Sequence, residues 1–381
     1  MNRLPLNPLL FFATLSLMLL GCADADAPPS EAHAGEVRLN DIQIVGSHNS
    51  YKRPIDPALL KMMQQEDPEQ AVALDYAHLP LHEQLDLGMR NLELDVYYDP
   101  EGGRYATPAG LSMVEATAYD PDGKMTSPGF KVLHVQDVDF RSSCLLFVEC
   151  LQEIESWSAA HPAHVPIIIT LNAKDEAFDR PDYVKPLPFD SAAFAALDAE
   201  IRSVISDVDL LTPDDVRGTH PTLEAAVLDE QWPTLEASRG QIVFVLDQGG
   251  AKLEAYRAGH PSLQGRAMFA NAPEGTPEAA IRIVNDPLGD FDYIQQLVRD
   301  GYLVRTRADA NTHEARTGNT ARRDSAFASG AQVITTDYYV PDTTLGTDYQ
   351  VQLPGDGVAR CNPVQETASC TSESLEKPQN Q

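Results

Sequence analysis

Short apolar runs recur along the chain and alternate with helical or loop-like stretches. The two clearest, at 166–171 and 241–246, are almost uninterrupted and rich in β-branched residues, which is typical of parallel strands covered on both faces. Apolar residues at helical spacing predict helices over 191–205 and 290–299, the second with Gly301 as its C-cap. Eight strand-like runs can be counted, at 41–46, 89–97, 130–136, 166–172, 241–247, 267–271, 301–307 and 331–337.

This alternation predicts an α/β fold, a closed (β/α)₈ TIM-type barrel that forms a single domain over 37–345. An open doubly wound sheet would show the same alternation, but no Gly-x-Gly-x-x-Gly motif follows the first strand. The chemically reactive residues are instead spread over several strand ends, which favours a barrel mouth. Residues 97–130 are predicted to form a loop or small hairpin on the mouth side, and residues 346–381 a polar C-terminal tail.

The N-terminus predicts export. Arg3 precedes a mostly apolar run at 9–20, which is shorter than the roughly 20 residues that a bilayer span needs. The run ends in Leu-Leu-Gly-Cys, which resembles a bacterial lipobox. Residues 1–22 are therefore predicted to be an export signal, with Cys22 acylated as a membrane anchor at the periplasmic or outer-membrane face. An ordinary secretory signal cleaved near 23–27 is the alternative.

Residues 23–36 are rich in Ala, Asp, Glu, Pro and Ser and show no apolar periodicity, so they are predicted to be a flexible tether. Four of the five cysteines fall into two close pairs, Cys144 with Cys150 and Cys361 with Cys370. Export favours disulfides, although the sequence leaves three pairings open for four cysteines. A zinc site is not expected, because neither pair has close ligand spacing or an adjacent histidine.

The net charge of −29 argues against nucleic acid as a partner, because its phosphates would be repelled. The charge also disfavours simple electrostatic adhesion to anionic lipid, a role that a lipid anchor would make unnecessary. Solubility outside the cell explains the charge equally well. The folded part is expected to be a monomer.

The second predicted strand carries two acidic residues. Apolar side chains share one face of this strand, and Glu93 and Asp95 share the other. Because the apolar face suits the helix layer, the two carboxylates are predicted to converge inside the barrel, where unpaired anions would be costly. Calcium prefers oxygen ligands and would fit these acids together with the amide oxygen of Asn49. A salt bridge to Arg305 or Arg307 is the alternative.

Two histidines lie near strand ends. His48 follows the first strand in the sequence Gly-Ser-His-Asn-Ser-Tyr, and His134 belongs to the third predicted strand. Taken singly, His48 could be a solvated turn residue and His134 a core residue. Together across a barrel mouth they would form an acid/base couple, because both imidazoles titrate near neutral pH. Asp137 or Asp139 could orient an imidazole or merely cap a helix.

Cationic side chains approach the mouth from two further strands. Asn172 and Lys174 share one face of the fourth strand, and Arg305 and Arg307 share one face of the seventh. Cations that face a metal site suggest an anionic substrate, because the arginine fork matches phosphate oxygens. A structural network would explain Arg305 equally well. Tyr338, at the end of the eighth strand, could stack on a sugar-like ring or seal the core.

Taken together, these segments resemble the catalytic barrel of phosphatidylinositol-specific phospholipases C, and most of all the secreted, calcium-dependent bacterial group. The resemblance covers roughly residues 37–345 and is therefore more specific than any one motif. It rests on 46–51, 93–95, His134, 270–272, 304–309 with Glu314 and Arg316, and 326–338.

The resemblance implies a phosphoric diester hydrolase acting on a membrane phospholipid. In such a reaction a 2-hydroxyl of the substrate attacks the neighbouring phosphorus and releases diacylglycerol and a cyclic inositol phosphate. By position, His48 would be the base or transition-state donor, and His134 its partner on the phosphoryl oxygens and the leaving group. Lys174 and Arg305 would hold phosphate groups, and Arg307 and Tyr338 complete the expected substrate-binding set.

The resemblance also implies one bound calcium ion, which would lower the pKa of the hydroxyl and neutralise developing charge. The family usually supplies a strand-4 glutamate as the fourth ligand, and here Asn172 takes that place. One negative charge fewer should weaken calcium binding. The expected ligands are Asn49, Glu93, Asp95 and Asn172.

Two other functions are considered. A glycerophosphodiester phosphodiesterase also uses a barrel, two histidines and a Glu-x-Asp pair and forms no cyclic phosphate, but its first histidine lies in a His-Arg-Gly context that His48 does not share. A catalytically inactive lipoprotein that binds phosphorylated sugars or lipids is the third possibility. Asn172 is the one feature that favours it, and it predicts ligand binding without turnover.

Overall fold

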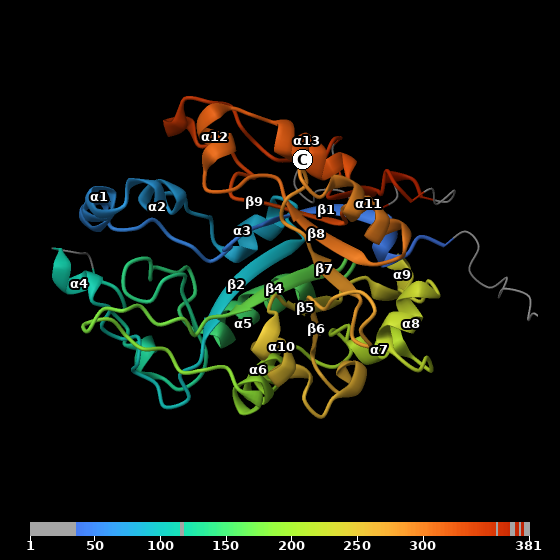
Figure 1. The fold of residues 1–381 in the computed structure, drawn as a ribbon, viewed down its shortest axis with the longest axis horizontal. Coiled ribbons are helices and arrows are strands. Elements are labelled where there is room, and N and C mark those ends of the chain that lie inside the picture. The colour runs from blue at the N-terminus through green and yellow to red at the C-terminus, as the bar shows by residue number, and fades with distance from the viewer. Residues whose placement is uncertain (1–35, 115–117, 356, 366–369, 373–374, 377–381) are drawn as a thin grey trace, which may run out of the picture. The chain divides into compact units, whose positions relative to one another are not determined.

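The computed structural model of the protein describes residues 36–114, 118–355, 357–365, 370–372 and 375–376. Eight parallel strands of this described part form a nearly closed barrel in the order β6-β5-β4-β2-β1-β9-β8-β7 (Figure 1). The predicted (β/α)₈-type barrel is therefore confirmed. The barrel strands are β1 (Ile42–Ser47), β2 (Asn91–Tyr97), β4 (Ile167–Ala173), β5 (Ile242–Leu246), β6 (Met268–Ala270), β7 (Ile281–Ile283), β8 (Leu303–Arg307) and β9 (Val333–Thr336).

The barrel is least complete between β6 and β7. A single backbone bridge, from Asn271 to Ile281, joins the two strands. The side chain of Asn271 reinforces it, because its Oδ1 accepts hydrogen bonds from the backbone N of Ile283 at 3.1 Å and from the guanidinium of Arg282 at 2.9 Å. The Asn271 side chain therefore adds hydrogen bonds where only one backbone bridge joins β6 and β7.

The predicted strand at 130–136 is not a barrel strand. β2 pairs directly with β4, whereas the two-residue β3 (Lys131–Val132) pairs antiparallel with the end of β2. The 97–130 insertion is thus closed as a hairpin, one of its two expected forms. The eighth barrel strand is instead β7, whose three residues make too short an apolar run to stand out in the sequence. His134 therefore reaches the mouth on the loop that follows β3 in the sequence.

Helices surround the barrel (Figure 1). The helices predicted over 191–205 and 290–299 are present as α6 and α11, and Gly301 follows α11 with a φ of +95°, as the predicted cap requires. No helix in the described part is both long enough and apolar enough to cross a membrane. The α-helices are α1 (Pro57–Glu66), α2 (Pro68–Ala73), α3 (Leu81–Asp86), α4 (Gly110–Met113), α5 (Phe147–Ala160), α6 (Ser191–Val204), α7 (Pro213–Arg217), α8 (Leu223–Leu228), α9 (Leu235–Ser238), α10 (Gly250–Arg257), α11 (Phe291–Arg299), α12 (His313–Thr317) and α13 (Ala321–Ala328).

The two faces of β2 are oriented as the alternation predicts. Leu92 and Leu94 are completely buried and belong to the same apolar cluster as residues of α5 and α6. Glu93 faces the opposite way and contacts Arg305 of β8 across the barrel interior. The period-two pattern therefore identified the side of the sheet that carries polar chemistry.

Two disulfides and a short C-terminal strand fasten segments that lie outside the eight barrel strands. Both close cysteine pairs are disulfides, Cys144–Cys150 and Cys361–Cys370. β10 (Ala359–Cys361) pairs antiparallel with the start of β1, so the described part of the C-terminal segment is anchored to the barrel. The predicted export signal, Cys22 and nearly all of the predicted tether lie outside the described residues.

Candidate active site at the barrel mouth

A cavity of about 750 Å³ lies at the carboxyl ends of β1, β8 and β9. One of its walls consists of α2 and the loop that leads into α12. These segments lie at the same end of the barrel (Figure 1) and are joined by a hydrogen bond from Thr312 Oγ1 to Val72 O at 3.0 Å. This is the end of the barrel at which TIM-type enzymes carry their active sites. The cavity lining includes His48, His134, Arg307 and Asp337, with Asp67, Glu69 and Glu314 on the helical wall.

The turn after β1 places His48 over β2. Gly46 permits this close approach, because a Cβ at that position would lie 2.4 Å from the carbonyl oxygen of Asn91. Ser50 then ties the turn to β2: its backbone N donates to Glu93 O at 2.9 Å, and its Oγ accepts from Glu93 N at 2.7 Å. As a result, His48 Nε2 lies 3.7 Å from Glu93 Oε1. The first predicted histidine thus lies beside the predicted acidic strand.

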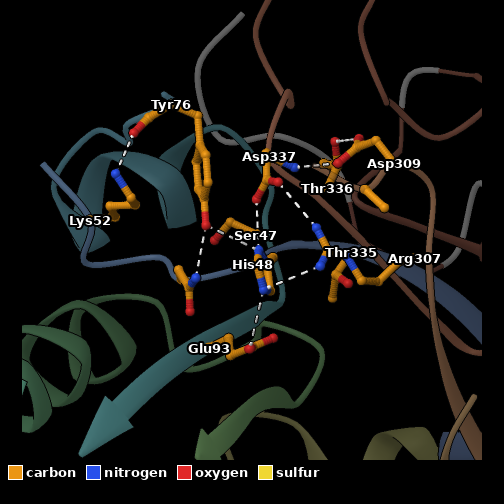
Figure 2. Close-up of polar contacts among 12 residues, drawn as sticks. Ser47, His48, Lys52, Tyr76, Glu93, Arg307, Asp309, Thr335, Thr336 and Asp337 are labelled. Carbon is orange, nitrogen blue, oxygen red and sulfur yellow. Dashed lines mark hydrogen bonds and ion pairs between the residues drawn. The ribbon is translucent and has the colours of Figure 1, made fainter. Parts of the chain in front are cut away.

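Asp337, at the end of β9, holds the His48 ring. His48 Nδ1 lies 2.9 Å from Asp337 Oδ1, and the Arg307 guanidinium lies 3.1 Å from the other carboxylate oxygen (Figure 2). Burial alone would raise the pKa of Asp337, but His48 and Arg307 outweigh it and lower that pKa to about 2. Asp337 is therefore an anion that accepts the Nδ1 proton. This leaves Nε2 as the atom of His48 that can take up or release a proton in the cavity.

His134 has a similar arrangement. Its Nδ1 lies 2.8 Å from Asp139 Oδ2, and its side chain is 17% exposed, nearly the same as the 18% of His48. Because both rings line one cavity, the structure brings the two predicted histidines together. Of the two aspartates considered, Asp139 orients the imidazole. Asp137 instead accepts hydrogen bonds from the backbone of the surrounding loops.

Two aromatic rings support His48 from behind. His78 Nε2 lies 2.8 Å from the backbone oxygen of His48, and burial lowers the pKa of His78 to about 4. This ring is therefore neutral at physiological pH and donates a hydrogen bond from Nε2 to that oxygen. The hydroxyl of Tyr76 lies 3.4 Å from His48 Nδ1 and accepts a hydrogen bond from the amide of Asn49 at 2.8 Å. His78 therefore fixes the backbone of the turn that carries His48, and Tyr76 contacts the side chains of that turn.

Glu93 is ion-paired within the barrel. Its Oε2 binds the guanidinium of Arg305, and its Oε1 accepts a hydrogen bond from the amide of Asn172 at 2.8 Å. Burial would raise the pKa of Glu93, but Arg305 and His48 outweigh it and hold that pKa below its ordinary value. The salt bridge that the sequence offered as an alternative for this acid is thus present, and Glu93 is ionised.

Asp95 is only partly compensated. It lies level with Asn172 on the neighbouring strand, and its Oδ2 is 3.6 Å from Lys174 Nζ. Its Oδ1 is buried and has no hydrogen-bond partner among the described residues. A buried polar atom left unpaired costs about 1–3 kcal/mol, and more when it is charged. A bound cation would satisfy this oxygen.

The residues around Asp95 fit calcium in their chemistry. The amide nitrogens of Asn49 and Asn172 are already engaged as donors, so the amide oxygens are the atoms that remain for a cation. Two carboxylates and two amides make the all-oxygen set that calcium accepts. No group of three or more His, Cys, Asp or Glu side chains within the described ranges is arranged to hold a metal.

The predicted substrate-binding residues comprise three cations that are paired with carboxylates and one tyrosine that is buried in the core. Each of the three cations contacts a carboxylate, Lys174 at Asp95, Arg305 at Glu93 and Arg307 at Asp337, and of these cations only Arg307 lines the cavity. Tyr338 does not line the cavity, which corrects its expected role in substrate binding. Its ring is 3% exposed and packs edge-on against Tyr349, so Tyr338 seals the core, the other outcome considered for it.

Three residues of the site were missed in the sequence. The sequence pattern could have indicated Asp337, because it lies two residues after Thr335 and so shares its face of the strand. Thr335 is the residue that pairs with Arg307 of β8. The pattern could also have indicated Asp247, since it follows β5. Burial raises the pKa of Asp247, and the carboxylates of Glu93 and Asp95 add to this rise. No pattern indicated Tyr76, because it lies in an irregular segment without periodicity.

The whole described barrel falls within one known family. A family profile described as Ca²⁺-dependent phosphoinositide phospholipase C matches residues 37–363, and thus most of the chain. None of the proteins with curated descriptions matches the chain. The match covers the cavity, both histidines and both acids of β2.

Solved structures show the same fold. A calcium-dependent phosphoinositol-specific phospholipase C from Pseudomonas sp. superposes with a TM-score of 0.53 at 17% sequence identity, over 86% of this chain and 96% of that one. The Ca²⁺-dependent phosphatidylinositol-specific phospholipase C of Streptomyces antibioticus superposes with a TM-score of 0.50 at 18% identity, over 80% and 95% of the two chains. At these identities the likeness establishes the shared barrel.

Proposed function

Since this chain belongs to the family of Ca²⁺-dependent phosphoinositide phospholipases C, which are phosphoric diester hydrolases, we propose that it cleaves phosphatidylinositol. The cleaved bond joins phosphorus to the glycerol oxygen, and the products are diacylglycerol and a cyclic inositol phosphate. The observation that supports this most is the pair of histidines in one cavity, each with its own aspartate, beside the acids of β2.

The two histidines divide the proton transfers. His48 Nε2 accepts the proton of the inositol 2-hydroxyl while the hydroxyl oxygen forms a bond to phosphorus. His134 gives a proton to the glycerol oxygen as the bond from phosphorus to that oxygen breaks. Asp337 and Asp139 hold the rings through Nδ1, so each Nε2 remains the reactive atom. Arg307, 3.4 Å from His48 Nε2, is placed to bind a phosphate oxygen.

Calcium is the proposed cofactor. Bound to Asn49, Glu93, Asp95 and Asn172, it would lower the pKa of the attacking hydroxyl and neutralise charge on the phosphate. The unpaired Oδ1 of Asp95 supports this assignment. The pairing of Glu93 with Arg305 keeps that carboxylate ionised and in place.

The cavity wall favours an inositol headgroup without further phosphates. Asp67, which caps the N-terminus of α2, lines the wall together with Glu69 of α2 and Glu314 of α12. Arg307, the arginine in the cavity lining, already contacts Asp337. An added phosphate on the inositol ring would face these carboxylates and be repelled. Hydroxyl groups would instead find hydrogen-bond acceptors there.

One assay tests the proposed reaction. The purified protein is incubated with phosphatidylinositol, with a phosphatidylinositol that carries ring phosphates, and with glycerophosphodiesters, each with and without calcium. Phosphorus NMR should show cyclic inositol phosphate from phosphatidylinositol alone among these substrates, and only with calcium. Non-cyclic product from glycerophosphodiesters would support that activity instead, and binding without product would support an inactive lipid-binding protein.

Replacing Asn172 with glutamate should tighten calcium binding by about tenfold, because calcium affinity rises with the number of charged ligands. Isothermal titration calorimetry of the substrate-free protein measures this directly. Asn285→Glu is the matched control, since it adds the same charge beside Arg305 but outside the proposed ligand set. Equal calcium affinity in Asn172→Glu and wild type would remove Asn172 from the ligand set.

Export of the protein is also proposed. The two disulfides support an oxidising compartment. Membrane attachment through acylated Cys22 and a monomeric state remain predictions. Mass spectrometry of the protein from membrane fractions tests the first, and light scattering tests the second.

A further inference from the structure

Lys52 is a completely buried lysine behind the active site. Its ammonium contacts three acceptors, the backbone oxygens of Leu74 at 2.8 Å and Tyr76 at 3.0 Å and Asp139 Oδ2 at 3.2 Å (Figure 2 shows the contact to Tyr76). It also lies 4.8 Å from the centre of the Tyr76 ring. Three acceptors match the three N–H groups of an ammonium, so this charge is fully satisfied.

The contacts of Lys52 connect it to both cavity histidines, to His134 through Asp139 and to His48 through Tyr76. Asp139 Oδ2, which binds Lys52, is also the atom that lies 2.8 Å from His134 Nδ1. In the other direction, Lys52 fixes the backbone of Tyr76, whose hydroxyl lies 3.4 Å from His48 Nδ1. Burying an ammonium is expensive, and well-packed apolar residues can often replace buried ion pairs without loss of stability. The charge therefore calls for an explanation beyond packing.

We propose that Lys52 is a positioning residue that holds His134, through Asp139, in the orientation needed for proton transfer and holds Tyr76 against His48. This inference rests on the proposed roles of the two histidines. Lys52 touches no substrate atom, since it is completely buried and is not part of the cavity lining. Its effect on the reaction passes through the residues that it contacts.

The charge balance around His134 shows what the loss of Lys52 would change, apart from the position of the ring. Burial would raise the pKa of Asp139, but Lys52 and His134 outweigh it and keep Asp139 ionised. The carboxylate then accepts the Nδ1 proton and leaves Nε2 directed at the cavity. Without Lys52, His134 would be the cation left to balance Asp139, so its protonated form would be favoured. The charged and titratable groups around His134 are Asp139 on its own loop, Lys52 behind Asp139, Tyr97 of β2, and those that line the same cavity: His48, Asp67, Glu69, Tyr76, Arg307, His313, Glu314 and Asp337.

Lys131 provides a matched control. It is also completely buried, and its ammonium contacts two backbone oxygens, Ser127 at 2.6 Å and Gly129 at 3.1 Å, and the carboxylate of Asp99 at 3.4 Å. Asp99 contacts no histidine in the described structure; it accepts a hydrogen bond from the backbone of Arg104 instead. Replacing either lysine removes a buried ammonium of the same kind, but only the Lys52 ammonium contacts a carboxylate that holds a histidine ring.

The test compares K52M with K131M. We expect K52M to lower kcat on the order of 10²-fold, the size of effect that a small misplacement of a reacting group produces, with little change in KM. Histidine ring NMR of the substrate-free protein should show His134 titrating at higher pH, by about one unit, with a mixed tautomer population. K131M should lose thermal stability but keep wild-type kcat and His134 titration.

A second variant, K52Q, keeps the test informative if K52M folds poorly. K52Q keeps amide donors for the carbonyl oxygens while removing the charge, and it is used if the circular dichroism of K52M differs from wild type. Wild-type kcat together with unchanged His134 titration in a folded Lys52 variant overturns the proposal, as does the same change in K131M. Because the NMR experiment needs no turnover, lack of phosphatidylinositol cleavage by the wild type would count against the proposed function and leave the role of Lys52 testable.

Discussion

Replacing His48 with alanine should lower kcat on phosphatidylinositol by about 10²–10⁴-fold, the range that general acid–base groups contribute. The change removes the proton acceptor at Nε2 and little core volume, because the ring is 18% exposed. Asp337 keeps its ion pair with Arg307, so no isolated buried charge is created. The unfolding temperature should therefore stay within a few degrees of wild type. Steady-state kinetics with calorimetry of unfolding measures both effects, and His134→Ala should give a loss of the same order.

The control for this prediction is His82→Ala. His82 is half exposed, pairs with Glu153 on the surface and does not line the cavity, so its removal should leave kcat unchanged. Wild-type turnover in either His48→Ala or His134→Ala would refute the two-histidine mechanism. Loss of turnover together with loss of the folded state would show a structural role instead.

Removing calcium with a chelator should suppress turnover on the order of 10³-fold. A Lewis-acid ion contributes several kcal/mol to transition-state stabilisation, and each 1.36 kcal/mol is a factor of ten in rate. The proposed site has two carboxylates and two amides, a set that suits calcium better than magnesium, which demands stricter geometry. Adding calcium back should therefore restore the rate more completely than adding magnesium.

An Asp95→Asn variant separates the metal effect from a general effect of the chelator. It should weaken calcium binding in calorimetry and raise the calcium concentration needed for half-maximal rate. Asp247→Asn serves as its comparison, because Asp247 lies at the end of the next barrel strand but one and outside the proposed ligand set. Full activity in the presence of chelator, or restoration by zinc alone, would rule out a calcium site.

The sequence predicted the barrel because parallel strands buried on both faces leave a strong apolar signal. It predicted the number of strands correctly but misplaced one of them. The 130–136 segment is apolar because it packs behind β2 as a hairpin arm, whereas β7 has three residues and two of its side chains are only half buried. Apolar content reports burial, and only pairing in three dimensions decides which buried segment joins the barrel.

The positions of site residues could be predicted from the sequence where those residues lie on strands or at strand ends. Alternation along β2 placed Glu93 and Asp95 in the interior, and strand ends indicated His48. The remaining parts depend on contacts between segments far apart in the chain, such as Lys52 with Asp139 or His78 with the backbone of His48. Buried lysines and histidines in irregular segments have no periodic signal, so only the folded chain shows what they support.

The seam between β6 and β7 bears on how this barrel avoids self-association. An incompletely closed barrel has two sheet edges, and exposed edges can pair with strands of other molecules. Here each edge strand is only three residues long, and the Asn271 side chain occupies a backbone N–H of β7 that an incoming strand would need. The guanidinium of Arg282 stands at the same place as a charge that such a strand would have to bury. The weakest junction of the barrel is thus also protected against intermolecular β-pairing.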